Sequence, residues 1–234
     1  MKQKFKKMIP KCVLNVLIDL HNRYFGGYAT KSYAQEGEDM ILRRVFEGQS
    51  SGFYVDVGAP HPMRFSNTYF FYKRGWRGIN IDAMPGSMKL FQKIRPEDTN
   101  LEIPIAAENK VLTYHIFNEP ALNGFDPQLS AAREAQPNRY KVIKTVDLRT
   151  KRLDQVLDEH LRENRTIDFL SIDVEGLDFD VLQSNNWEKY RPNVILVEIL
   201  ASSLAELESN KVSLFLKKQG SLFVQHAELE KATS

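Results

Sequence analysis

The sequence predicts an α/β protein built around a largely parallel β-sheet. Two short runs rich in β-branched residues, 53–59 and 78–82, contain an acid or a glycine where each strand is expected to end. Their acids, Asp56 and Asp82, lie 26 residues apart, which is the length of a strand, a helix and a strand. Because parallel sheets bind ligands at the carboxyl ends of their strands, we expect these acids and Gly58 to face a crevice.

The glycine pattern after the first strand restricts the kind of ligand. Gly58 is followed by no further glycine until Gly75, so the three-glycine motif that holds a pyrophosphate is absent. A nucleoside without a pyrophosphate needs one close backbone approach, at Gly58, and one carboxylate for its ribose hydroxyls, at Asp82. Two buried strands that end in capping aspartates are the alternative interpretation, but the spacing of the pair favours a site.

Length and composition limit the classes of protein that fit. The chain has 234 residues, enough for one domain with a full core and an appended arm but not for a second catalytic domain. A single cysteine, Cys12, excludes a disulfide framework and a thiolate metal cluster, and it suits a reducing, cytoplasmic compartment. The net charge is +2, of which five lysines among the first eleven residues account for +5, so the remainder is mildly acidic and is not expected to bind nucleic acid.

Residues 1–30 are predicted to form a basic amphipathic arm, and residues 31–234 the main domain. The apolar side chains of the arm fall on one face of a helix that starts near Pro10, namely Val13, Leu17, Leu20 and Tyr24. The apolar run 12–20 is too short and too interrupted to cross a bilayer or to act as a secretory signal. Lysines at its start suit an anionic membrane surface, so we expect peripheral membrane contact, with a helix packed on the domain as the alternative.

The first half of the main domain follows a βαβαβ pattern. Acidic residues at 35–39 mark a helix start, Gly75 marks the end of the next helix, and Pro96 marks the end of the third. The expected order is helix 40–46, strand 53–59, helix 64–74, strand 77–83, helix 85–94 and strand 101–107.

The segment 110–150 interrupts this rhythm and predicts a β-rich insertion between the third and fourth strands of the sheet. Strands are expected at 113–117 and 142–146, separated by a loop at 119–127 that is rich in Pro, Asn, Gly and Asp. Such insertions commonly decide substrate specificity. The alternation then resumes with helix 153–162, strand 167–174, helix 179–190, strand 193–200, helix 209–218 and strand 221–225.

Asp173 and Glu175 are the strongest candidates for chemistry. They alternate at the carboxyl end of a predicted buried strand and should share one face. Two carboxylates placed this close together at the end of a buried strand cost free energy unless they bind a cation such as Mg²⁺, the charged end of a cofactor or a substrate hydroxyl. One of the carboxylates could also act as a general base. Helix capping by Asp173 is the alternative. Glu198, which ends the neighbouring strand, is a candidate of the same kind.

His61 is a second candidate base, because it lies three residues after Gly58 and imidazole has a near-neutral pKa. Pro60 and Pro62 flank it, so a structural role in a rigid turn is the alternative. Residues 66–68 are expected to cap the following helix.

Six segments, taken together and in order, resemble the FkbM family of S-adenosylmethionine-dependent methyltransferases over about residues 32–200. Each segment by itself is only weakly specific for this family, but six such segments in the same order are a strong indication of the resemblance. The segments are QEGED (35–39), FYVDVGA (53–59), RFSNT (64–68), GWRGINID (75–82), EPALN (119–123) and SIDVEG (171–176).

The resemblance implies a Rossmann-like class I methyltransferase with a mostly parallel sheet covered by helices on both faces. It implies methyl transfer from S-adenosylmethionine to a hydroxyl, often on a sugar or polyketide, and we expect a sugar or glycan precursor as acceptor. The turn at 56–59 would face the methionine part, Asp82 would hold the ribose, and Ala106 or Ala107 would lie near the adenine. The expected cofactor-binding residues are therefore Asp56, Gly58, Ala59, Asp82, Ala106 and Asp173.

The resemblance leaves the roles of Asp173 and Glu175 open between metal binding, orientation of the cofactor and removal of a proton. We expect His61 or Asp173 to act as base in an in-line displacement at the methyl group, with Mg²⁺ at Asp173 and Glu175 as an additional candidate. Class I methyltransferases end in a β-hairpin, yet about ten residues follow strand 221–225, so a shortened hairpin is expected.

Two other functions stay open. An NAD-dependent sugar-modifying enzyme would also begin with a strand, a helix and a strand and would also use an acid to bind the ribose hydroxyls. The absence of the three-glycine motif counts against this function. A catalytically inactive methyltransferase fold could act as a docking or assembly subunit through its basic arm, but the intact acids at Asp56, Asp82 and Asp173 argue against decay. The sequence does not predict an oligomeric state.

Overall fold

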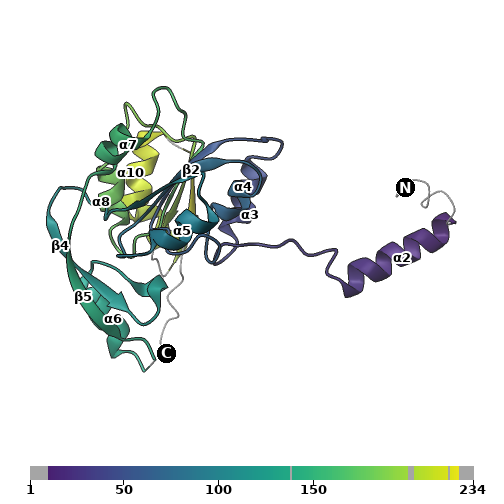
Figure 1. The fold of residues 1–234 in the computed structure, drawn as a ribbon, viewed down its shortest axis with the longest axis horizontal. Helices are drawn as coiled ribbons and strands as arrows, with labels where there is room; N and C mark the ends of the chain where they lie inside the picture. Colours follow the sequence, from purple (N-terminus) through teal and green to yellow (C-terminus); the bar gives the residue numbers. More distant parts are fainter. Residues whose placement is uncertain (1–9, 138, 200–202, 221, 227–234) are drawn as a thin grey trace. The chain divides into compact units, whose positions relative to one another are not determined.

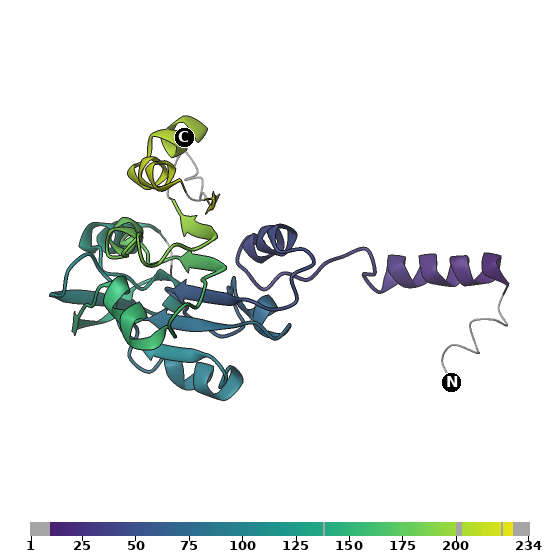
Figure 2. The ribbon, with the colours of Figure 1, turned by 90° about the horizontal axis from the view of Figure 1, so that it is seen from above.

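The computed structural model describes residues 10–137, 139–199, 203–220 and 222–226. The chain divides into two compact units, Met1–Ser32 and Tyr33–Ser234. In the first unit, the predicted helix is α2 (Lys11–Tyr24), which Pro10 precedes and which is the purple coil in Figures 1 and 2. Within the described ranges, none of the helices combines the length and the apolar character that a membrane span requires.

The second unit is built on a six-stranded sheet with the order β3-β2-β1-β6-β7-β8. All neighbouring strands run parallel. The strands are β1 (Phe53–Val57), β2 (Arg77–Asp82), β3 (Thr99–Glu102), β6 (Phe169–Ile172), β7 (Val194–Glu198) and β8 (Leu222–His226). The chain order reverses between β1 and β6, which confirms the predicted doubly wound α/β fold and places the ligand crevice at their carboxyl ends.

Helices cover both faces of this sheet, as predicted. On one face, alternate side chains such as Val55 and Val57 form a core with α7 (Leu153–His160), α8 (Asp178–Gln183) and α10 (Lys211–Gln219). On the other face, an aromatic core joins the sheet to α3 (Glu38–Val45) and α4 (Tyr69–Tyr72); its buried members are Leu42, Tyr54, Phe71, Trp76, Phe169, Val194 and Leu196. This alternation follows from the two-residue period of a strand. The remaining helices of the alternation are α5 (Met88–Ile94) and α9 (Leu204–Ser209).

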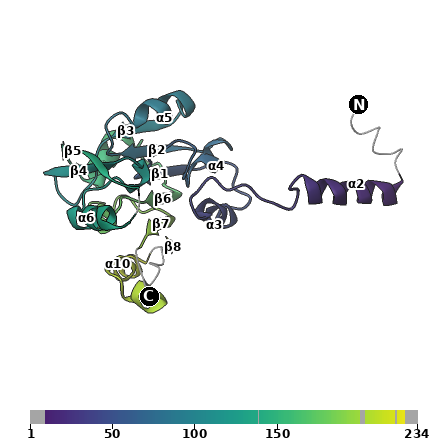
Figure 3. The same cartoon turned by 90° about the horizontal axis from the view of Figure 1, so that it is seen from below.

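The predicted β-rich insertion is an antiparallel pair of strands, β4 (Val111–Phe117) and β5 (Val142–Arg149), which forms a sheet of its own. Between the strands lie a short 3₁₀ helix, η1 (Pro120–Leu122), and α6 (Pro127–Ala135). Figures 1 and 3 show β4, β5 and α6 together at one end of the second unit. The ends of the insertion meet, because the N–H of Thr150 donates to the Lys110 carbonyl (2.8 Å) and the N–H of Lys110 donates to the hydroxyl of the buried Thr150 (3.0 Å).

Several predicted boundaries were wrong for local reasons. The expected helix 64–74 is reduced to α4, because Phe65 has a φ of +54° and the hydroxyl of Ser66 accepts the N–H of Tyr69 at 3.1 Å. The expected strand 101–107 ends early, because β3 stops at Glu102. Pro104 has no N–H to donate, and the chain then turns so that Ile105 pairs with Lys151.

The last helix is also different from the prediction. Instead of one helix over 209–218 there are two, α9 and α10, which meet at Asn210. The side chain of Asn210 accepts the N–H of Val212 (2.9 Å) and so caps the second helix. The predicted ends of two strands, Leu200 and Ser221, lie outside the described residues, as do residues 227–234, where a terminal hairpin would continue.

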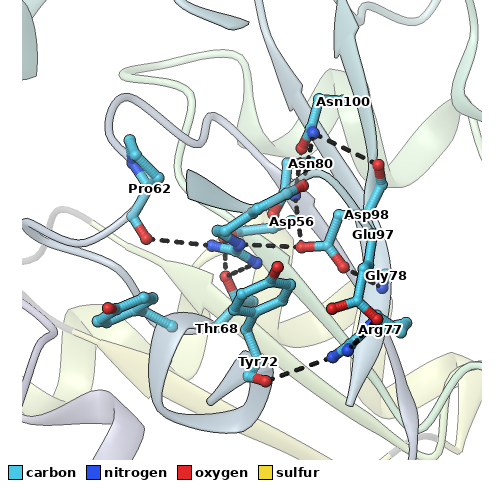
Figure 4. Close-up of polar contacts among 12 residues, drawn as sticks. Asp56, Pro62, Thr68, Tyr72, Arg77, Gly78, Asn80, Glu97, Asp98 and Asn100 are labelled. Atoms are coloured by element: carbon cyan, nitrogen blue, oxygen red, sulfur yellow. Dashed lines mark hydrogen bonds and ion pairs between the residues drawn. The ribbon is translucent and has the colours of Figure 1, made fainter. Parts of the chain in front are cut away.

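A buried polar network joins β1, β2 and the segment after α5. Arg95 and Asp98 form an ion pair of 2.9 Å, and neither side chain is accessible to solvent. Arg95 Nη2 also donates to the hydroxyls of Tyr54 (2.7 Å) and Thr68 (3.0 Å). Asp98 accepts hydrogen bonds from Tyr54, from the side chain of Asn80 and from the N–H of Gly78. Figure 4 shows Asp98, Asn80, Gly78 and Thr68 in this cluster.

Substitution of Arg95 is expected to destabilise the fold strongly. Arg95→Met leaves Asp98 buried without its cation, so we expect the free energy of unfolding to fall by about 3–5 kcal/mol. Urea denaturation near neutral pH measures this loss. The matched control is Arg44→Met, which breaks the exposed pair of Arg44 with Glu47 and should cost less than about 1 kcal/mol. Similar losses in the two variants would contradict the importance of the network.

Candidate active site

A cavity opens at the carboxyl ends of β1, β2, β6 and β7, where the strand order predicts a ligand site. The space between its walls is about 1040 Å³ when the open solvent in its mouth is included. The ends of these strands and the turns that follow them contribute Gly58, Asp82, Asp173, Glu175 and Glu198 to its wall. The insertion contributes Tyr114, Leu122, Asn123, Phe125 and Arg133.

Gly58 brings the turn after β1 against the loop after β6. Its φ is +89°, and a Cβ atom at this position would lie 1.7 Å from the carbonyl oxygen of Asp173. On either side of this contact, the N–H of Gly58 donates to the Ile81 carbonyl (2.9 Å) and the N–H of Asp173 donates to the Val57 carbonyl (3.0 Å). Glycine is therefore required here for close packing of protein backbone, in addition to its place in the cavity wall.

Asp82 ends β2 with its carboxylate at the cavity. It is 8% exposed, and its Oδ1 accepts the N–H of Met84 at 2.9 Å. Burial raises the pKa of Asp82 to about 6, because removal from water disfavours the charged form, and the nearby carboxylates of Glu102 and Asp56 act in the same direction. Hydroxyl donors from a ligand would stabilise the ionised carboxylate.

Asp173, Glu175 and Glu198 form a cluster of carboxyl groups in which one oxygen of each lies within 4.8 Å of the others. Protein atoms surround Asp173, yet more than a third of its surface is accessible, because that surface faces the cavity. Burial and the charges of Glu198 and Glu175 raise the pKa of Asp173 well above its usual range, and its carboxyl group is hydrogen-bonded to that of Glu198. Three carboxylates at these separations could hold a divalent cation or share a proton.

Arg133 connects the insertion to this cluster. It comes from α6, forms an ion pair with Glu175 and donates through Nη1 to the Leu122 carbonyl (3.1 Å). Glu175 has a φ of +54°, an unfavourable conformation for a residue other than glycine. Phe65, with the same φ, also lines the cavity. Backbone strain of this kind costs about 1–3 kcal/mol and is found mostly at functional sites.

Four of the predicted site residues do not line the cavity. Asp56 is buried among hydroxyl groups, where it accepts a hydrogen bond from Thr68 (2.8 Å) and another from Ser171. Burial raises the pKa of Asp56, and Arg95 partly opposes that rise. Strand alternation explains the placement, because Asp56 shares the face of Tyr54 rather than that of Val57.

The other three are His61, Ala59 and Ala106. The Nδ1 atom of His61 accepts the N–H groups of Met63 and Arg64, both at 3.0 Å, as expected for a structural turn. Burial and the charge of Arg64 lower the pKa of His61. Ala59 packs against α5, and Ala106 is fully buried, with its N–H bonded to Lys151.

The sequence did not predict which residues of the insertion form one wall of the cavity. Tyr114 and Phe125 pack with their ring centroids 4.7 Å apart, and both line the cavity with Arg133. The sequence does carry one signal for this wall. Asp126 followed by Pro127 is typical of a helix start, and Asp126 caps α6 through the N–H groups of residues 128 and 129.

The chain also matches the model of a known protein family. The family model of the FkbM methyltransferase domain matches residues 56–223, which is more than half of the chain. Searches of curated proteins and of solved structures gave no significant match.

The contact at Gly58 leads to a prediction that a paired substitution can test. Gly58→Ala is expected to destabilise the protein clearly more than Gly75→Ala. Both residues have a φ near +90°, so both variants suffer the backbone cost of about 1–2 kcal/mol. Only Gly58 has backbone within contact distance of the added methyl, whereas nothing lies within 4 Å at Gly75. Equal urea midpoints for the two variants would show that the turn relaxes without cost.

Burial of Asp82 predicts a stability change that depends on pH. The pKa of Asp82 in the folded protein is about 6, which is above the pKa of an aspartate in the unfolded chain. The contribution of Asp82 to the free energy of unfolding is therefore fully present at acid pH, where the side chain is protonated, and is lost as the pH rises through 6. Asp82→Asn should therefore have little effect near pH 4 and stabilise the protein by roughly 3 kcal/mol above pH 7. Thermal and urea unfolding across this range measure the difference. Asp147→Asn, an exposed change on β5, is the control, and identical pH profiles for the two variants would contradict the prediction.

Proposed function

Because the chain belongs to the FkbM methyltransferase family, we propose that it transfers a methyl group from S-adenosylmethionine to a hydroxyl oxygen of a sugar or glycan precursor. The observation that carries this proposal is the arrangement of Gly58, Asp82 and Asp173 around one cavity, at the ends of three adjacent strands. A nucleoside site and a candidate base thus share one space.

The residues of the cavity fit this cofactor. The Asp82 carboxylate can accept hydrogen bonds from the two ribose hydroxyls, and it is buried enough for those bonds to be strong. Ile103, Pro104 and Ile105 line the cavity after β3 and offer an apolar surface to a base ring. The carboxylates of Asp173 and Glu175 supply the negative charge that a cationic amino acid group requires.

In this mechanism the protein mainly has to align the acceptor hydroxyl with the methyl group and to remove the proton of that hydroxyl. When bound, the cofactor supplies a methyl group already activated for displacement. We assign Asp173 as the base, since it faces the cavity and the hydrogen bond to Glu198 holds its carboxyl group in place. Asp173 would take the proton of the acceptor hydroxyl, and Gly58 and Asp82 would hold the cofactor, which supplies the methyl group to that oxygen and leaves as S-adenosylhomocysteine. His61 is the weaker choice, because its Nδ1 already accepts two N–H groups.

A divalent cation is the second way in which the carboxylates could act. An ion held by Asp173, Glu175 and Glu198 would lower the pKa of a bound hydroxyl and help to release its proton. The ion pair between Arg133 and Glu175 counts against this, since the cation would have to compete with it.

The acceptor side of the cavity suits a polyhydroxylated molecule. Gln35, Asn67 and Asn123 contribute polar groups to its wall, which also contains the rings of Phe65 and Phe125. Amide groups can both donate to and accept from hydroxyls, and aromatic faces pack on the apolar side of a ring. This mixture supports a sugar as the class of acceptor.

Calorimetric titration tests the cofactor class directly. We expect binding of S-adenosylmethionine and S-adenosylhomocysteine but not of NAD. Asp82→Ala should weaken both by about 10–100-fold, the cost of lost hydrogen bonds to a charged group, while Asp147→Ala on exposed β5 should not. Absence of binding would refute an active methyltransferase and favour a docking subunit, and binding of NAD alone would favour a dehydrogenase.

A turnover assay tests the acceptor class and the assignment of the base. Release of S-adenosylhomocysteine in the presence of a panel of nucleotide sugars and oligosaccharides reports the acceptor. Asp173→Asn should abolish this release while weakening cofactor binding by no more than about tenfold, because Glu175 still supplies negative charge for the cationic amino acid group. Unchanged release would overturn the base assignment, and release that stops on dialysis against EDTA and returns with Mg²⁺ would favour the cation.

A further inference from the structure

Helix α2 presents a broad apolar face to solvent. None of its residues is buried, and its exposed large apolar side chains run from 43% exposure at Leu20 to 73% at Tyr24. At 3.6 residues per turn, one side of the helix gathers Val13, Val16, Leu17, Leu20 and Tyr24. Phe25 and Tyr28, just after the helix, are 78% and 72% exposed. A contiguous apolar surface of this kind marks a site of interaction.

The charge around this face is strongly positive. Residues 1–32 contain seven Lys or Arg and one Asp, a net charge of +6, which leaves −4 for residues 33–234 from the total of +2. The single carboxylate, Asp19, lies on the polar side of the helix with Asn15 and Asn22. It is paired with Arg23 (3.2 Å) and accepts the Tyr28 hydroxyl (3.0 Å). Its negative charge is therefore compensated locally.

The described surface of the second unit has no apolar patch that matches the face of α2. Its exposed large apolar residues are scattered over separate elements: Ile41, Val45, Met63, Leu90, Val111, Ile143 and Leu214. Only Ile41 and Val45 are neighbours on one helix, α3. A second copy of the chain is also a poor match, because pairing two such helices would bring two basic arms of +6 together.

We propose that residues 1–32 bind the surface of an anionic lipid bilayer. Helix α2 lies in the plane of the surface with its apolar face among the upper acyl chains, and the net charge of +6 on residues 1–32 attracts this segment to the lipid phosphates. A helix of 14 residues is about 21 Å long, which suits a position along the interface. Phe25 and Tyr28 extend the apolar face with aromatic rings, which favour the interfacial region.

The test is vesicle flotation of the full-length protein with two matched variants. The vesicles contain either phosphatidylcholine alone or phosphatidylcholine and phosphatidylglycerol in equal parts. Leu17→Asp and Asn15→Asp each add one negative charge to an exposed position of α2, but only Leu17 lies on the apolar face. We expect the wild type to bind the anionic vesicles, less so in high salt, and Leu17→Asp to bind at least about tenfold more weakly than Asn15→Asp.

Five results would overturn the proposal. Four of them are no binding of the wild type to anionic vesicles, equal binding to the two kinds of vesicle, equal binding of the two variants, and a dimer in sedimentation velocity that Leu17→Asp dissociates. A lower melting temperature for Leu17→Asp than for Asn15→Asp would equally refute it, since the helix would then pack on the protein itself. The inference does not depend on the proposed function, because vesicle binding is measured without cofactor or acceptor.

Discussion

The backbone contact between Gly58 and Asp173 is the constraint on which the cavity depends. It joins the turn after β1 to the loop after β6, the two strands between which the chain order reverses. No side chain fits between them, so the loop that carries Asp173 is held directly against the turn after β1. The ligand site therefore inherits the rigidity of the parallel sheet, which is what alignment of two reactants requires.

The two faces of the sheet serve different purposes around this contact. One face is a conventional apolar core, whereas the other contains a charged cluster centred on Arg95 and Asp98. Such pairs are weak evidence for stability, since well-packed apolar groups often do as well. Their geometric effect is clearer: through Thr68 the cluster reaches Asp56, so the loop before α4 is tied to β1 by directed hydrogen bonds.

The sequence predicted the fold well, and it predicted some of the residues that line the cavity. Runs of β-branched residues identify parallel strands, and their ends identify where Asp82 and Asp173 lie. Chain spacing does not reveal the direction of a side chain, so Asp56 was predicted to face the ligand although it is on the other face. Contacts between distant residues, such as Arg133 with Glu175, arise from tertiary packing that no local pattern records. The helix α6 was missed because its capping signal lay inside a segment rich in loop-forming residues.

The meeting of the two ends of the insertion has an evolutionary consequence. Hydrogen bonds between Lys110 and Thr150 close the segment at its base, so everything between them leaves and rejoins the sheet at one place. A segment attached in this way can be lengthened, trimmed or replaced as a cassette without a change in strand order. Such a change would alter one wall of the cavity and leave the wall formed by Gly58 and Asp82 in place.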